Sequence, residues 1–300
     1  MRSFKILCTF AFICMFVVGS LLAFAQSGKG TGSGRRGETL NVIVHAPEGA
    51  KISKDDVDLY DSGIAQEVET FNKVDAGSRI VLMIDDSSNL RVESEVLQKT
   101  IAAVINELYE DDQMMIVAYN EEADILVDMT PDSKAMQGAF AKMHRKGFPN
   151  LFEGLVAVSD ALVHQAKTGV EKRAIILISD GYDSESKTKF DDALRTLQEE
   201  NILLYAIKVP DRTHGALIKD KPKPAIALER LTSGTGGKIF PIDKGEEAAK
   251  TIADDLRKNW YRLTYSPAGV NPINLRRLIL MSRHKEVEFR TKDSHPPKYH

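Results

Sequence analysis

Cysteine is almost absent from this chain: its 300 residues include two, Cys8 and Cys14. Both lie within the first 25 residues, in a mostly apolar run that follows Arg2 and Lys5. Removal of this stretch would leave a chain with no disulfide, no thiolate metal site and no cysteine nucleophile. An exported protein without cysteine fits a bacterial periplasm or exterior better than a disulfide-stapled ectodomain.

The first 25 residues have the form of a secretory signal peptide. The apolar run ends in Ala23-Phe24-Ala25, a small-x-small sequence that predicts cleavage after Ala25. An uncleaved membrane anchor is the alternative, because the run is long enough to span a bilayer. The cleavage pattern favours a secreted or periplasmic protein with no membrane span in the mature chain. Residues 26–37, rich in Gly and Ser, are then predicted to form a flexible linker.

The chain also lacks a strong excess of either charge and the common catalytic motifs. Its net charge is −3, with basic residues dispersed among acidic ones, so we predict no nucleic-acid partner. There is no Gly-x-Ser-x-Gly segment, and the histidines show no metal-ligand spacing. The glycine-rich stretch 234–237 precedes a predicted strand, so no helix N-terminus follows it to bind a phosphate. We therefore predict that the protein is not an enzyme and has no catalytic residues.

Two short apolar runs, 80–84 and 174–179, dominate the middle of the sequence. Such runs are typical of strands buried on both faces of a parallel sheet. From residue 80 onward, predicted strands alternate with segments of helical spacing. The pattern predicts an α/β fold with a Rossmann-like, open and mostly parallel sheet covered by helices on both faces.

The segments on either side of this core are predicted to be rich in β-structure. Strands are expected at 39–44, 57–60 and 65–74, and a closing β pair at 275–281 and 286–290. Within the core, a helix is expected to start at Pro131 and to carry Met136, Phe140 and Met143. The predicted organisation is a signal peptide (1–25), a linker (26–37), a β-rich lead-in (38–77), the α/β domain (78–266), a C-terminal β extension (267–291) and a flexible tail (292–300).

Each of the two apolar strands leads into an aspartate, Asp85 and Asp180. The carboxyl ends of central parallel strands meet at one edge of a sheet, so we expect these carboxylates to converge. Ser87 and Asn89 project from the loop after the first strand. Carboxylate, hydroxyl and amide oxygens suit Mg²⁺, Mn²⁺ or Ca²⁺. The alternative is a polar turn in which Ser and Asn only cap the following helix.

With these strands and loops the sequence resembles the von Willebrand factor type A family, over about residues 78–265. The resemblance lies in four segments: Asp85-x-Ser87-x-Asn89, Asp180-Gly181, PNLFEGL from Pro149 and TGGKIF from Thr235. It implies a metal-ion-dependent adhesion site in which Asp85, Ser87, Asn89 and Asp180 hold one divalent cation, usually Mg²⁺. An acidic side chain of a protein partner would complete the coordination. The flanking β segments and residues 254–267 resemble a bacterial secreted subgroup.

The chain departs from the family pattern at two positions. Asn89 stands in place of the second serine, and its amide oxygen can still bind a hard cation. Pro149 stands in place of a threonine and offers no side-chain oxygen, so Asn150 or water would have to fill the gap. Two functions therefore remain open: a secreted protein-binding or adhesion module with a partly degenerate cation site, and a metal-free structural or assembly domain.

Overall fold

The computed structural model describes residues 37–165, 172–216 and 219–298. The predicted signal peptide and all but the last residue of the predicted linker lie outside these residues. Within the described part of the chain, no helix combines the length and the apolar character that crossing a membrane requires.

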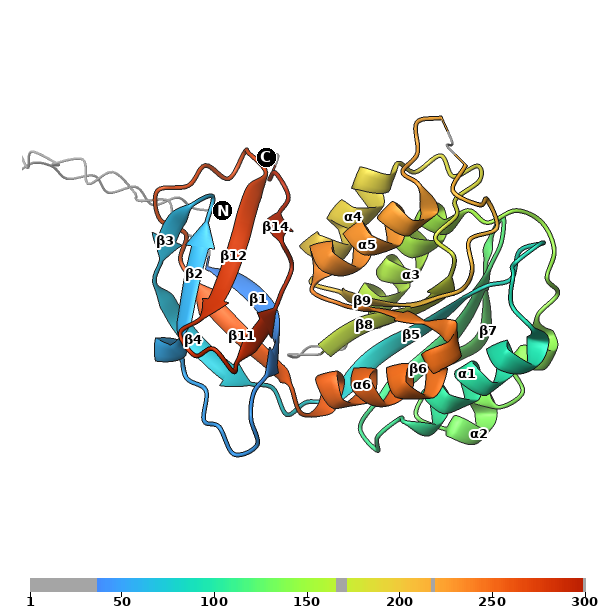
Figure 1. Ribbon diagram of the computed structural model, residues 1–300, viewed down its shortest axis with the longest axis horizontal. Coiled ribbons are helices and arrows are strands. Elements are labelled where there is room, and N and C mark those ends of the chain that lie inside the picture. The colour runs from blue at the N-terminus through green and yellow to red at the C-terminus, as the bar shows by residue number, and fades with distance from the viewer. Residues whose placement is uncertain (1–36, 166–171, 217–218, 299–300) are drawn as a thin grey trace, which may run out of the picture. The chain divides into compact units, whose positions relative to one another are not determined.

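Strand β5 (Ser78–Asp85) lies inside a six-stranded sheet with the order β10-β9-β8-β5-β6-β7 (Figure 1). The pairs are parallel except for β6 and β7, which form an antiparallel hairpin. The predicted mostly parallel sheet is therefore confirmed. The other strands are β6 (Gln113–Tyr119), β7 (Ala123–Thr130), β8 (Lys172–Ser179), β9 (Leu203–Lys208) and β10 (Ile239–Pro241).

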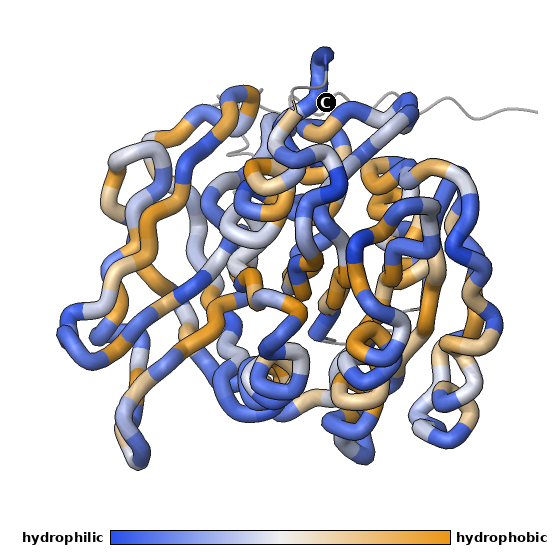
Figure 2. The backbone as a smooth tube through the Cα atoms, turned by 45° about the vertical axis from the view of Figure 1, so that its right-hand side comes forward, coloured by the Kyte–Doolittle hydropathy of each residue, from blue (hydrophilic) through white to orange (hydrophobic). Residues whose placement is uncertain are grey.

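Helices cover both faces of this sheet, which explains the continuous apolar run in β5. Ile80, Leu82 and Ile84 pack into one core cluster, whereas Val81 and Met83 pack into the other. Figure 2 shows hydrophobic segments along the strands and hydrophilic ones in many of the loops. One face carries α1 (Ser94–Asn106), α2 (Ser133–Met136) and α6 (Gly245–Arg257), and the other carries α3 (Leu151–Gln165), α4 (Phe190–Glu199) and α5 (Pro224–Thr235) (Figure 1).

The segments before and after the α/β core form two further four-stranded sheets, which share one apolar cluster that includes Leu40, Leu59 and Leu263. The sheet order is β13-β1-β11-β4 in one and β14-β12-β2-β3 in the other. The predicted lead-in and C-terminal extension therefore fold together as a β-sandwich. Its strands are β1 (Glu38–His45), β2 (Val57–Asp61), β3 (Ile64–Gln66), β4 (Val68–Lys73), β11 (Trp260–Tyr265), β12 (Arg276–Ser282), β13 (Glu288–Arg290) and β14 (Ser294–His295).

Two strand predictions and the prediction of a flexible tail are wrong in detail. The predicted strand 65–74 is interrupted at Glu67, because β3 belongs to one sheet of the sandwich and β4 to the other. The predicted closing pair does not form, since β12 pairs with β2 and β14 while β13 pairs with β1. The tail does not fray at its start: Ser294 and His295 are buried and form β14.

The helix predicted from Pro131 is also wrong in extent. It ends at Met136, and a separate 3₁₀ turn, η2 (Phe140–Lys142), follows it. Gly138 lies between the two, where a residue without a β-carbon weakens a helix. Further 3₁₀ turns are η1 (Lys54–Asp56) and η3 (Ile242–Lys244).

Candidate functional site

The two predicted aspartates lie at the carboxyl edge of the six-stranded sheet, at its topological switch point. The chain continues from β5 to β6 on one side and from β8 to β9 on the other, so the strand order reverses between β5 and β8. Asp85 ends β5 and is fully buried. Its Oδ1 accepts hydrogen bonds from the backbone N–H of Ser87, at 3.0 Å, and from the Ser87 hydroxyl. Asp85 and Ser87 thus form one compact turn.

Asp180 follows β8 and is also fully buried. Its Oδ1 accepts a hydrogen bond from the Tyr182 N–H at 3.0 Å. The next residue, Gly181, has a φ of +84°, and a Cβ built there would lie 2.4 Å from the carbonyl oxygen of Pro224. The glycine of the Asp-Gly pair therefore allows the N-terminus of α5 to pack closely against this loop.

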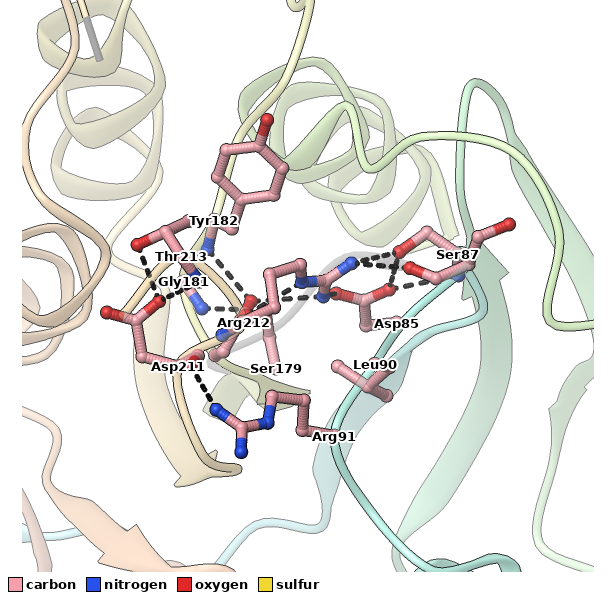
Figure 3. Close-up of polar contacts among 12 residues, drawn as sticks. Asp85, Ser87, Leu90, Arg91, Ser179, Gly181, Tyr182, Asp211, Arg212 and Thr213 are labelled. Atoms are coloured by element: carbon pink, nitrogen blue, oxygen red, sulfur yellow. Dashed lines mark hydrogen bonds and ion pairs between the residues drawn. The ribbon is translucent and has the colours of Figure 1, made fainter. Parts of the chain in front are cut away.

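A third charged side chain, Arg212, forms hydrogen bonds with both aspartates. Figure 3 shows its guanidinium directed toward Asp85 and Ser87. It comes from the loop after β9, and its side chain is 8% exposed. Its Nε donates to Asp180 Oδ2 at 2.7 Å and its Nη2 to Asp180 Oδ1 at 3.0 Å, a bidentate pair. Nη2 also donates to Asp85 Oδ2, and Nη1 donates to the Ser87 hydroxyl at 2.6 Å and to the Ser88 carbonyl at 3.1 Å. The guanidinium therefore joins both strand-end loops.

Burial and pairing act in opposite directions on these charges. Burial raises the pKa of Asp85, while Arg212 and Ser87 oppose that rise. Burial disfavours the charge of Arg212, but the hydrogen bonds to Asp180 and the nearby carboxylate charges outweigh it and raise the pKa of Arg212. Arg212 is therefore a permanent cation. Burial also raises the pKa of Tyr119, whose neutral hydroxyl lies 2.8 Å from Ser179 Oγ.

This arrangement does not fit the divalent cation that the family resemblance implies. Mg²⁺ binds oxygen ligands at about 2.0–2.1 Å in near-octahedral geometry. The oxygens of Asp85, Ser87 and Asp180 instead accept hydrogen bonds from Arg212, a positive group that repels a second cation. In the part of the chain that the structure describes, no group of three or more His, Cys, Asp or Glu residues is placed to hold a metal.

The other two predicted ligands have different surroundings. Asn89 is exposed in the left-handed region, with a φ of +62°, and no described hydrogen bond joins its side chain to Asp85 or Asp180. Asn150 accepts a hydrogen bond from the Glu185 N–H and donates one to the Glu121 carbonyl, each at 3.2 Å. Of the five predicted metal residues, the structure thus brings three together around Arg212: Asp85, Ser87 and Asp180.

Sequence reasoning missed Arg212 and a second buried ion pair nearby. Lys221 pairs with Asp183 Oδ2 and donates to the Ser184 carbonyl at 2.6 Å. Both cations lie in the segment between β9 and α5, whose basic composition is visible in the sequence. The acid that each cation contacts is not visible there. Arg212, for example, lies 125 positions from Ser87 along the chain.

A groove of about 690 Å³ adjoins the site at the N-terminal ends of α1 and α6. Its lining combines apolar side chains with charges of both signs. The guanidinium of Arg91, on one side of the groove, donates to the Asp211 carbonyl at 3.3 Å (Figure 3). The groove is therefore continuous with the loop that carries Arg212. The lining includes Arg91, Val92, Val96, Lys99, Pro210, Ile242 and Glu246.

Comparisons with known proteins agree with this fold. The family model described as the von Willebrand factor type A domain matches residues 80–182. A structure of von Willebrand factor type A from Catenulispora acidiphila has a TM-score of 0.50 and 12% identity, covering 85% of this chain and 72% of that chain. An aerotolerance-related membrane protein from Bacteroides fragilis NCTC 9343 and the conserved hypothetical protein BatB from Bacteroides thetaiotaomicron each have a TM-score of 0.49 and cover 61% of this chain. Their identities are 14% and 15%, over 100% and 98% of their own chains. No curated protein matches.

The matched segment begins in β5 and ends just after β8, so it contains Asp85, Ser87 and Asp180. The structure from Catenulispora acidiphila shares the fold at 12% identity. The family predicted from the strand-end motifs is therefore confirmed. Residues 80–182 of this chain match the von Willebrand factor type A domain, and three of the predicted metal residues there, Asp85, Ser87 and Asp180, surround Arg212.

Proposed function

We propose that this chain is a protein-binding module that acts outside the cytoplasm, and that it binds its partner at the carboxyl edge of the six-stranded sheet. Von Willebrand factor type A domains typically mediate protein interactions and are generally not enzymes. The observation that carries the proposal is the groove beside the Arg212 loop, at the switch point where open α/β sheets bind their ligands. The location outside the cytoplasm rests on the signal-peptide pattern of residues 1–25.

The chemistry of this groove suits a segment of protein. Val96 exposes 38% of its surface, and Val92, Pro210 and Ile242 line the same groove. The charges around these apolar groups are mixed, and Lys99 already pairs with a glutamate of α6. A surface of this kind offers apolar contacts surrounded by polar ones, as protein interfaces do, and lacks the single-sign charge that nucleic acids require.

Of the two functions left open by the sequence, we propose the metal-free one. A divalent cation would need an acidic side chain of the partner to reach a free coordination position beside Asp85 and Asp180. Arg212 stands at that place, hydrogen-bonded to both carboxylates. In this proposal the partner contacts the groove rather than a metal ion, and binding does not depend on Mg²⁺.

Site-specific photo-cross-linking tests this function in the cell that produces the protein. A photoreactive amino acid replaces Val96 in the groove or, as the matched control, the exposed Glu110 in the loop before β6, at the opposite edge of the sheet. We expect one discrete protein adduct from position 96, equally strong with and without a chelator, and none from position 110. Equal labelling at both positions, or no adduct at position 96, would contradict the proposal. An adduct that disappears with the chelator would favour the metal-dependent version.

A further inference from the structure

Asp85 and Asp180 place two acidic groups at the ends of adjacent strands, and both side chains are fully buried. An ionised carboxylate is unfavourable away from water unless a positive charge and hydrogen bonds compensate it. Two neighbouring carboxylates also repel each other. The end of the sheet between β5 and β8 therefore requires a cation.

We propose that Arg212 is this cation, a built-in positive charge that takes the place of a divalent metal ion (Figure 3). A guanidinium has five N–H donors, and each of them has an acceptor here. Two go to the Asp180 carboxylate and one to Asp85, while the remaining two go to the Ser87 hydroxyl and the Ser88 carbonyl. Because no donor is left over, Arg212 compensates charge inside the domain and offers no hydrogen bond to an external ligand.

The backbone around Arg212 is fixed to the same site. The N–H of Arg212 donates to Asp180 Oδ2 at 3.0 Å. The preceding residue, Asp211, accepts hydrogen bonds from the N–H groups of Thr213, at 2.7 Å, and Gly215, at 3.0 Å, which holds the loop in a turn. The ring of Tyr182 lies 5.5 Å from the guanidinium carbon. The position of Arg212 therefore depends on its loop as well as on its side chain.

This proposal goes beyond the binding function and concerns charges within the domain. It implies that the intact protein needs no metal ion. Loss of Arg212 would leave two carboxylates and a hydroxyl, the oxygen ligands that Mg²⁺ and Mn²⁺ prefer. Replacing Arg212 should therefore convert the site into one that responds to these ions.

The test compares thermal unfolding and calorimetric titration of the mature protein in EDTA and in millimolar MnCl₂. We expect the wild type to unfold at the same temperature in both, with no heat of Mn²⁺ binding. Arg212→Ala should unfold at a lower temperature in EDTA and regain roughly 5 °C in MnCl₂. Lys221→Ala is the matched control, because it removes a cation from a single buried carboxylate, Asp183. It should lose stability without any recovery in MnCl₂.

Two results would overturn the proposal: Mn²⁺ binding by the wild type that disappears in Asp180→Asn, or a folded Arg212→Ala with no response to Mn²⁺. If Arg212→Ala fails to fold, the folding of the double variant Arg212→Ala/Asp85→Asn tests the proposal instead. It removes one positive and one negative charge together, so the proposal requires that folding returns, and continued failure to fold contradicts it. No binding partner enters these measurements, so their failure is distinct from failure of the cross-linking at position 96.

Discussion

Arg276 on β12 and Asp61 on β2 form an ion pair at 2.7 Å, although both side chains are buried in the β-sandwich. The same Asp61 oxygen accepts a hydrogen bond from the Tyr265 hydroxyl at 2.9 Å, and Arg276 also pairs with Glu38 at 2.7 Å. Tyr265 and Glu38 belong to the opposite sheet. This buried network therefore joins the two sheets, and with them the segments that precede and follow the α/β core.

Arg276→Met should destabilise the protein strongly, because it leaves Asp61 charged and buried with its cation removed. We expect the free energy of unfolding to fall by about 3–5 kcal/mol, measured by urea denaturation. Arg283→Met is the matched control: Arg283 pairs with Asp58 at the same 2.7 Å but is 56% exposed. Its loss should change the free energy of unfolding by less than about 1 kcal/mol. Equal effects of the two variants would contradict this account of the network.

Gly237→Ala should destabilise the α/β domain, because a Cβ at this position would lie 1.8 Å from the carbonyl oxygen of Leu204 on β9. The obstacle is backbone in a paired strand, so relief requires the strand itself to shift. We expect a loss of about 3 kcal/mol or more in the free energy of unfolding. The control is Gly138→Ala, since nothing lies within 4 Å of a Cβ at Gly138. If both variants unfold at the wild-type urea concentration, the close approach at Gly237 is not important.

Thr235→Val tests a hydrogen bond in the same segment. The buried Thr235 hydroxyl accepts from the Leu204 N–H at 3.0 Å and donates to the Leu231 carbonyl at 2.8 Å. Valine has nearly the same shape but leaves the N–H unpaired, which should cost about 1–3 kcal/mol of unfolding free energy. Thr235→Ser should restore most of this loss. Thr251→Val, which removes an exposed hydroxyl on α6, should have a much smaller effect.

The parts of the fold that could be predicted from sequence are those set by local patterns. The run 80–84 is apolar throughout because its alternate residues face two different cores, and this pattern identifies a central strand. Pairing between distant strands has no such local signal. The segment that became β13 looks like a hairpin partner of β12, but it pairs instead with β1, far away in the sequence. The burial of His295 likewise depends on contacts that only the folded sandwich supplies.

The candidate site also has residues that could be predicted from the sequence and residues that could not. Asp85, Ser87 and Asp180 follow recognisable strands, so their convergence could be predicted from topology. Arg212 lies in a loop of irregular sequence, and its partners come from two other loops. Composition indicated that this loop is basic, but not that one of its cations is directed inward. For Asn150, residue type suggested a ligand, whereas its amide joins two loops by hydrogen bonds.

Lys292 should make the free energy of unfolding change with pH in the alkaline range. It is 6% exposed, and its Nζ donates to the Gln198 carbonyl at 2.9 Å and to the Asn201 side chain at 2.8 Å. Burial lowers its pKa from 10.5 to about 8. Of the charges that face it, Glu38 and Glu199 favour the ammonium form, whereas Arg276 and Lys298 oppose it.

Between about pH 8 and about pH 10.5 the unfolded chain therefore holds the Lys292 proton more often than the folded protein does. The free energy of unfolding should rise with pH across this window, with a slope of at most about 1.4 kcal/mol per pH unit from this group. Urea denaturation at several pH values, for the wild type and Lys292→Met, isolates the contribution as the difference between them. The hydrogen bonds lost in the variant shift this difference by a constant, so the slope is the quantity to compare. Lys285→Met, a change at an exposed lysine, is the control and should keep the wild-type slope. If the wild type and Lys292→Met show parallel pH profiles, Lys292 does not bind its proton less tightly in the folded protein.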